Sequence, residues 1–217
     1  MSLEREKQLA AEAAAQLVED GMTLGLGTGS TVGYLLSALA ARGLELRCVA
    51  TSPATEEIAR GLGMRVEPFA GAGAPTRLDL AIDGADQVAP SGWELKGGGG
   101  AQTREKAVAA AADRFVVIVS SDKVVARLSP PVPLELLEYG LGATLRRLQP
   151  VALRDVPQSP DGGVIADYLG EFDDPEALAA RLDSTIGVVE HGLFSPRLVS
   201  EVLVARGADV ERRVIPG

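Results

Sequence analysis

The sequence predicts an α/β fold in which a mostly parallel sheet covered by helices is joined to a smaller α+β domain. Three observations predict it. Short apolar runs bounded by Gly, Pro or Asp recur through the first 129 residues, and helical patterns separate several of these runs. Strands that alternate with helices form a parallel sheet with helices on its faces. Near Ser129 the pattern changes, which indicates a second domain.

The larger domain is expected to begin with a helix. Residues 2–18 place apolar residues and alanines at helical spacing and end near Gly21, where a helix can stop. In a parallel sheet the loops after the strands share one rim, where ligands bind, so we expect GTGST, DGAD, KGGGGAQ and SSDK to lie together. The expected strands are 22–27, 44–50, 64–69, 78–86 and 115–121, and the expected helices between them include 31–43, 53–63 and an alanine-rich one after Thr103.

The smaller domain is predicted from the segment after Ser129. Its opening, SPPVPLEL, contains three prolines, which end the preceding pattern. The order βαββαβ is the ferredoxin-like unit, so we place this domain at 130–192 and the larger one at 1–129 plus 193–217, with the tail 201–215 returning to the first sheet. The expected elements are strand 132–136, helix 139–149, strands 151–154 and 164–170, helix 175–183 and strand 186–192.

Composition and charge exclude some classes of partner. The 217 residues are 46% hydrophobic, which is enough to bury a full core. The formal net charge of −9 argues against nucleic acid and anionic membrane as partners, because both would be repelled. An anionic ligand would therefore need a locally positive site.

The cysteine content and the hydropathy favour the cytoplasm. Cys48, the one cysteine, lies in an apolar run and cannot form an internal disulfide, which suits a reducing compartment. No signal segment opens the chain, and no apolar run reaches the roughly 18 residues of a membrane span. We expect a cytoplasmic protein.

The first candidate site is the loop Thr28, Gly29, Ser30 and Thr31, which follows an expected strand and precedes an expected helix. Backbone N–H groups at a helix N-terminus, together with hydroxyls, favour an anion site. The alternative is that Ser30 or Thr31 only caps the helix. Dinucleotide binding fits poorly, because no G-x-G-x-x-G is present and the next strand ends without an acidic residue.

A second candidate site is Asp83-Gly84-Ala85-Asp86, at the end of an apolar strand. Two carboxylates three residues apart can share one hydroxylated ligand or bind a divalent cation. The alternative is a turn that ends the strand. The metal interpretation is the weaker one, because the single histidine, His191, lies in the second domain and is interpreted as a satisfied or surface residue.

The third candidate site is LKGGGGAQTREK, residues 95–106. Each glycine costs roughly 0.5–1 kcal/mol relative to alanine in ordered structure, so Gly97, Gly98, Gly99 and Gly100 indicate close backbone approach or positive φ. Main-chain N–H groups there would face a substrate oxygen, Lys96 would add charge, and Glu105 would supply a base. The alternatives are a flexible linker and, for Glu105, an acid that only satisfies the helix dipole. Lys123, on the same rim, either meets a phosphate or is solvated.

Six motifs occur along the chain in the order seen in one known family: GLGTGST, DGAD, KGGGGAQTREK, SSDK, VPLELLEYG and VVEHGLF. By these motifs the chain resembles the type A ribose-5-phosphate isomerase family over nearly its whole length. The resemblance implies a Rossmann-like domain plus a ferredoxin-like domain, acting as a homodimer or homotetramer without a metal or other cofactor. It implies interconversion of ribose 5-phosphate and ribulose 5-phosphate in the pentose phosphate pathway. The ligand would be a sugar phosphate.

The resemblance also implies roles for matched positions. Glu105 matches the general base that moves a proton between C2 and C1 through a cis-enediolate. Asp83 matches the carboxylate that assists ring opening and Asp86 one that holds sugar hydroxyls, although either aspartate could reach the ring oxygen. Lys96 and the N–H groups of residues 97–99 match contacts to the enediolate and hydroxyls. The phosphate contacts match residues 28–31 and Lys123, and more weakly Lys7.

Two positions depart from the family pattern. Gln87 stands where the family commonly has Glu, and Gln102 stands where it commonly has an apolar or small residue. Neither residue has a proposed chemical role, so the departures concern loop packing. Two other functions remain open: a sugar-phosphate-sensing module that binds without turnover, and an enzyme resembling a CoA-transferase or an amino-sugar-phosphate deaminase.

Overall fold

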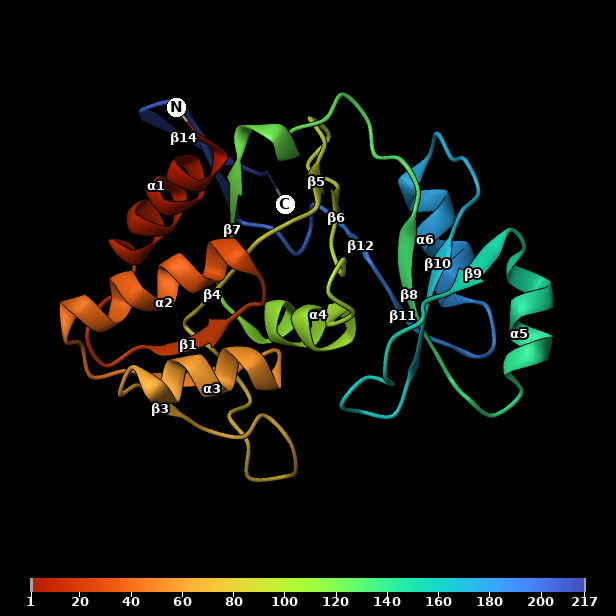
Figure 1. Ribbon diagram of the computed structural model, residues 1–217, viewed down its shortest axis with the longest axis horizontal. Helices are drawn as coiled ribbons and strands as arrows, with labels where there is room; N and C mark the ends of the chain where they lie inside the picture. Colours follow the sequence, from red (N-terminus) through yellow and green to blue (C-terminus); the bar gives the residue numbers. More distant parts are fainter. Residues whose placement is uncertain (1, 217) are drawn as a thin grey trace.

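A seven-stranded sheet forms the larger part of the computed structural model, which describes residues 2–216 (Figure 1). Its strand order is β14-β13-β7-β4-β1-β2-β3, and every neighbouring pair is parallel except the hairpin of β13 and β14. The strands are β1 (Thr23–Leu26), β2 (Arg47–Ala50), β3 (Arg65–Val66), β4 (Leu80–Asp83), β7 (Phe115–Ser120), β13 (Glu201–Arg206) and β14 (Asp209–Val214).

Helices cover both faces of this sheet. One apolar core joins the sheet to α1 (Leu3–Ala15), α2 (Ser30–Arg42) and α3 (Pro53–Gly61). A second core, on the other face, includes Val108 and Ala109 of α4 (Gln102–Ala111). Because the chain moves outward from β1 to β2 on one side and to β4 on the other, the strand order reverses at β1, where open α/β sheets bind ligands.

A four-stranded antiparallel sheet forms the smaller part, at the right of Figure 1. Its order is β11-β8-β10-β9, which is the fourth, first, third and second strand of a βαββαβ unit. The elements are β8 (Val132–Leu136), α5 (Leu141–Leu148), β9 (Val151–Leu153), β10 (Val164–Tyr168), α6 (Pro175–Asp183) and β11 (Val188–His191). The Rossmann-like and ferredoxin-like architecture is therefore confirmed, while the division at 130–192 stays a prediction.

Several predicted elements are shorter in the structure. The first helix ends at Ala15 rather than Val18, and the strand expected at 64–69 pairs only at Arg65 and Val66. Pro68 has no backbone N–H to offer a ladder, which limits that strand. The tail forms a hairpin whose first strand joins β7, as expected for a return to the first sheet.

A third, three-stranded sheet, which the sequence does not predict, connects the two parts. It consists of β12 (Leu193–Phe194), β6 (Glu94–Leu95) and β5 (Gln87–Val88) in that order. Runs of two residues are too short to show strand periodicity, so this sheet depends on tertiary contact. At its end the Lys96 N–H donates to Gly192 O (2.8 Å) and the Gly192 N–H donates to Pro133 O (2.8 Å).

The helices of residues 2–216 are all too short or too polar to cross a bilayer.

Candidate active site

A cavity of about 180 Å³ lies where the four glycine- and hydroxyl-rich loops meet. The loops after β1, β4, β6 and β7 thus share one rim, as the parallel topology predicts. Every predicted site residue lines this cavity except Asp83, and Lys7 joins them. The lining comprises residues 28–31, 84–86 and 96–99 with Lys7, Glu105 and Lys123.

The loop after β1 presents the N-terminus of α2 to this cavity. Gly29 occupies the N-cap position with φ of 114°, and no side chain of residues 2–216 caps the helix. Ser30 and Thr31 are therefore the first helical residues rather than caps, which leaves the first N–H groups of the helix available to an anion. Thr28 is held by a hydrogen bond between its Oγ1 and Thr51 Oγ1 (2.7 Å).

Asp83, at the end of β4, does not line the cavity but contacts residues that do. Its Oδ1 accepts hydrogen bonds from the N–H groups of Thr28 (2.9 Å) and Gly84 (2.7 Å). A side chain at Gly27 would place Cβ 1.9 Å from the same oxygen, so only glycine fits there. Asp83 thus fixes two loops that line the cavity, whereas Asp86 lines it directly.

Lys96 is buried between two carboxylates. Its side chain is 2% exposed, and its Nζ lies 2.8 Å from Asp83 Oδ2 and 3.2 Å from Glu105 Oε2. It also donates a hydrogen bond to the carbonyl of Gly84. Burial disfavours the ammonium, but the charges of Asp83 and Glu105 outweigh this cost and raise the pKa of Lys96 above its usual range. Lys96 is therefore a permanent cation at the cavity.

Glu105 lies in the first turn of α4 and is 5% exposed. Its pKa is raised to about 7, first by burial and then by the charge of Asp83, while Lys96 opposes both effects. Its Oε2 is near the ammonium but accepts no aligned hydrogen bond from the part of the chain that is described. A carboxylate that lines the cavity and has a pKa near neutrality is suited to accept and return a proton.

The tetraglycine turn, residues 97–100, requires glycine for two reasons. Gly97 and Gly100 have φ of 92° and 75°, values that side chains rarely tolerate. At Gly98 a Cβ would lie 2.8 Å from Asp86 Oδ1, so the backbone approaches that carboxylate closely. The Gly98 N–H donates to Asp86 Oδ2 (2.8 Å) and is already occupied. This turn is ordered and packed, unlike a linker.

The two lysines at the edge of the cavity differ in their partners. Lys123 belongs to the short helical turn η1 (Ser121–Lys123), and its ion pair within the described residues is a long contact with Asp122 (3.8 Å). Lys7 on α1 pairs with Glu4 (2.7 Å). Both ammonium groups add positive charge to a chain whose net charge is −9.

Glu6 is a site-supporting residue that the sequence analysis did not identify. Its Oε2 accepts from the N–H (2.9 Å) and hydroxyl (2.7 Å) of Ser121, and its Oε1 accepts from the Gly207 N–H (2.8 Å). These bonds, first of all the one from Gly207, hold the pKa of Glu6 below its usual value. Glu6 thereby fixes the turn that carries Lys123. No local pattern reveals a contact across 115 residues.

Glu94 is a second residue that the sequence analysis missed. It is fully buried in β6, two residues before Lys96, and neither carboxylate oxygen has a hydrogen-bond partner among residues 2–216. Burial raises its pKa to about 8, while Lys96 opposes the shift and Asp83 adds to it. Glu94 is therefore mostly neutral at pH 7.

We expect Glu94 to make stability fall with pH. Below about pH 4.5 it is protonated in both states and contributes nothing. Between about pH 4.5 and 8, Glu94 is ionised in the unfolded chain but still protonated in the folded one. The free energy of unfolding therefore falls as pH rises, until Glu94 is ionised in both states. In Glu94→Met this slope should be absent. Urea unfolding at pH 5 and pH 8 measures it, and an equal difference between variant and wild type at both values would contradict the expectation.

The two departures from the family pattern have different environments. Gln87 clamps the backbone of Ser129: its amide donates to Ser129 O (3.0 Å) and accepts from Ser129 N (2.9 Å). A carboxylate could accept but not donate, so Gln suits this contact. Gln102 is fully buried below the tetraglycine turn, and its amide has no partner among the described residues. Neither residue lines the cavity, so both departures concern the packing of loops around it.

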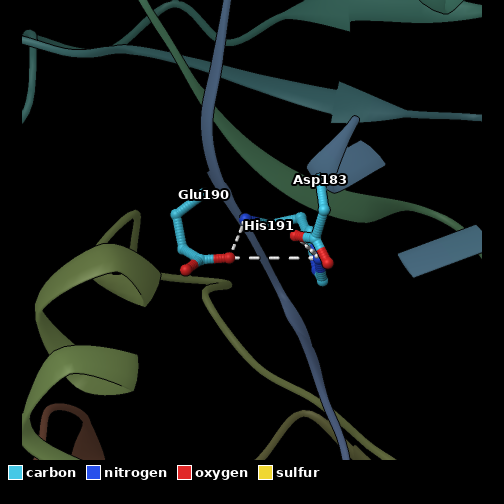
Figure 2. A group of neighbouring side chains, drawn as sticks. All are labelled: Asp183, Glu190 and His191. Carbon is cyan, nitrogen blue, oxygen red and sulfur yellow. Dashed lines mark hydrogen bonds and ion pairs between the residues drawn. The ribbon is translucent and has the colours of Figure 1, made fainter. Parts of the chain in front are cut away.

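A separate cluster of Asp183, Glu190 and His191 brings together side chains of metal-binding type (Figure 2). His191 is buried and satisfied: its Nδ1 accepts from the Leu193 N–H (3.2 Å), and its Nε2 lies 3.0 Å from Asp183 Oδ1. Lys106 Nζ donates to Glu190 Oε1 (2.6 Å). Because the carboxylates and ring nitrogens already pair within the protein, we infer no metal site here.

The fold and the cavity define a class of protein: an α/β protein with a Rossmann-like sheet, in which a buried lysine and an acidic side chain line one cavity. Comparison with known proteins identifies its family. The sequence model of the family ribose 5-phosphate isomerase A (phosphoriboisomerase A) matches residues 47–209. A ribose-5-phosphate isomerase A of Caulobacter vibrioides (strain NA1000 / CB15N) is 43% identical over 228 residues, covering 98% of this chain and 99% of the relative. This chain belongs to the ribose 5-phosphate isomerase A family, as its motifs indicate.

Solved structures agree with this assignment. The ribose 5-phosphate isomerase A of Neisseria gonorrhoeae has a TM-score of 0.92 and 29% identity, covering 100% of this chain and 99% of the other. A D-ribose-5-phosphate isomerase in complex with phospho-erythronic acid has a TM-score of 0.89 and 31% identity, covering 99% and 100%. The protein is an isomerase by family.

Proposed function

We propose that this protein interconverts D-ribose 5-phosphate and D-ribulose 5-phosphate through a cis-enediolate, in the non-oxidative pentose phosphate pathway. The observation that carries the proposal is the packing of Glu105, Lys96 and the tetraglycine turn around one cavity. The complex of a related isomerase with phospho-erythronic acid supports a sugar phosphate as ligand.

The phosphate would bind at the hydroxyl-rich end of the cavity. The uncapped N-terminus of α2 and the side chains of Thr28, Ser30 and Thr31 provide N–H and O–H donors, and Lys123 and Lys7 provide charge. Binding energy gained at the phosphate would position the reacting carbons at the other end, which is how a remote anchor contributes to catalysis.

Proton transfer would occur between Glu105 and the open-chain sugar. Glu105 takes the proton from C2, the electron pair forms a C1–C2 double bond, and negative charge develops on the former aldehyde oxygen. Lys96 and main-chain N–H groups of the tetraglycine turn stabilise that charge. Return of the proton to C1 and transfer of the hydroxyl proton from O2 to O1 give the ketose.

Before this step the furanose ring must open. Asp83 or Asp86 would assist by accepting or delivering a proton at the ring hydroxyl and ring oxygen. In the structure Asp86 lines the cavity and Asp83 stands behind it, paired with Lys96. The geometry therefore favours direct sugar contact by Asp86 and an orienting role for Asp83.

We further propose a cytoplasmic homodimer or homotetramer that needs no metal or organic cofactor. Exposed apolar side chains on the smaller part of the protein support association, among them Tyr139 (90% exposed) and Ile186 (79% exposed). The acidic net charge supports the absence of nucleic-acid and membrane partners.

The direct test mixes purified protein with ribose 5-phosphate in D₂O containing a metal chelator and follows both ketose and deuterium by NMR. We expect ketose formation with deuterium incorporated at the carbons that exchange protons. Tight binding without exchange would instead indicate a sensing module. Activity on glucosamine 6-phosphate or an acyl-CoA, with none on the pentose, would indicate the deaminase or transferase alternative.

A further inference from the structure

Arg154, a residue with no role assigned so far, contacts the tetraglycine turn from the smaller sheet. It follows β9, and its Nη1 donates to the carbonyl oxygens of Gly97 (3.1 Å) and Gly98 (2.9 Å). Its Nε and Nη2 make a two-point pair with Asp167 on β10, at 2.8 and 2.7 Å. One guanidinium thus links two main-chain carbonyls of the site to a carboxylate of the other sheet.

We propose that Arg154 is a positioning residue that aims the Gly99 amide into the cavity; this inference rests on the proposed isomerase function. In a trans peptide the carbonyl of one residue and the N–H of the next point in opposite directions. Holding the Gly98 carbonyl therefore turns the Gly99 N–H away from the guanidinium. Gly99 lines the cavity, and no acceptor takes its N–H within residues 2–216.

The neighbouring peptide follows the same geometry. Arg154 holds the Gly97 carbonyl, and the Gly98 N–H on the same peptide plane donates to Asp86 Oδ2 (2.8 Å). The guanidinium therefore helps to place Asp86, which lines the cavity, as well as the free Gly99 donor. Without it, the remaining main-chain bond of the turn, from Gly100 N to Gly97 O (2.9 Å), would leave the Gly98–Gly99 peptide free to rotate.

The rigid Arg154 side chain compensates for the backbone freedom of the tetraglycine turn. Four consecutive glycines have more backbone freedom than any other sequence, so an oxyanion donor placed on them needs an external constraint. The planar guanidinium supplies several donors in a fixed orientation, and Asp167 holds that orientation. Its positive charge also polarises the two carbonyls, which makes the attached N–H groups stronger donors.

The test compares Arg154→Met with Arg104→Met. Arg104 on α4 makes the same kind of two-point pair, with Asp161 at 2.6 and 2.9 Å, and this pair joins α4 to the smaller part of the protein. Within residues 2–216, Arg104 makes no hydrogen bond to the tetraglycine turn. We expect Arg154→Met to lower kcat for ribose 5-phosphate by ~10- to 100-fold with a much smaller change in KM, because a displaced donor costs transition-state stabilisation. Arg104→Met should stay within about twofold of wild type.

A binding measurement separates this inference from the proposed function. The affinity for phospho-erythronic acid, whose carboxylate puts a negative oxygen on a sugar phosphate, should fall by about tenfold in Arg154→Met and stay unchanged in Arg104→Met. Absence of turnover in wild type would overturn the proposed function, and this affinity difference would still test the placement of the donor.

Arg154→Lys provides a variant that keeps the charge and most of the volume. A lysine cannot hold two carbonyls and a carboxylate in one plane, so kcat should still fall, by roughly 3- to 10-fold. Thermal melting checks that all three variants are folded. Wild-type kcat in Arg154→Lys, or equal losses in Arg154→Met and Arg104→Met, would overturn the inference.

Discussion

Replacing Glu105 with Gln should lower kcat for ribose 5-phosphate by ~10²- to 10⁴-fold, the usual contribution of a positioned general base. The amide has nearly the same shape as the carboxylate but cannot accept the C2 proton. KM should change little, because the phosphate is predicted to be bound by other residues of the cavity, residues 28–31 and Lys123. Steady-state ketose formation measures kcat, and deuterium exchange in D₂O shows whether proton removal itself is lost.

Glu57→Gln provides the matched control, because Glu57 lies exposed on α3 and away from the cavity. Its turnover should equal that of wild type. Undiminished turnover in Glu105→Gln would exclude Glu105 as the base.

The raised pKa of Glu105 adds a pH dependence to this prediction. Only the ionised carboxylate accepts a proton, and its pKa in the ligand-free protein is about 7, so kcat/KM should decline as pH falls through 7, approaching tenfold per unit at lower pH. A profile of kcat/KM in wild type measures this acid limb. A kcat/KM that remains constant down to pH 5 would contradict the assignment.

Replacing Lys96 with Met should reduce both stability and activity. The change leaves the carboxylates of Asp83 and Glu105 buried without their cation, and breaking a buried ion pair costs about 3–5 kcal/mol. The loss should be smaller at pH 5 than at pH 8, because protonation of Glu105 removes one of the uncompensated charges. Urea unfolding at the two pH values measures this.

A double variant distinguishes a charge effect from a packing effect. If the penalty in Lys96→Met is electrostatic, adding Glu105→Gln should recover part of the lost stability, because one buried charge disappears. If the stability losses of Lys96→Met and Glu105→Gln instead add up in the double variant, Lys96 acts through the volume that it fills.

Much of the fold follows from local sequence signals. The alternation of apolar runs with helical patterns predicts the parallel sheet and the βαββαβ unit, and both are confirmed. Parallel topology then predicts that loops far apart in the chain share one rim, which is why the sequence alone is enough to group residues 28–31, Asp86 and Glu105. Their roles in catalysis and binding stay predictions.

The remainder depends on contacts that no local pattern records. The two-residue strand that precedes Lys96 has no periodicity of its own, and its neighbours come from residues 87–88 and 193–194. Glu6 and Arg154 act on the cavity from 115 and about 57 residues away, as ordinary charged residues on a helix and in a loop. The position of Asp83 behind the cavity likewise depends on how closely the backbone at Gly27 approaches it.

Gly192 restricts how this enzyme can admit its ligand. Its Cβ position would lie 2.2 Å from the Lys96 carbonyl oxygen, and its N–H and C=O join Pro133 of one sheet to Lys96, which directly follows β6. Any hinge motion between the two sheets would therefore pull the Lys96 ammonium away from Glu105. We expect the two halves of the protein to stay rigid with respect to each other, and sugar phosphates to enter by movement of the rim loops alone.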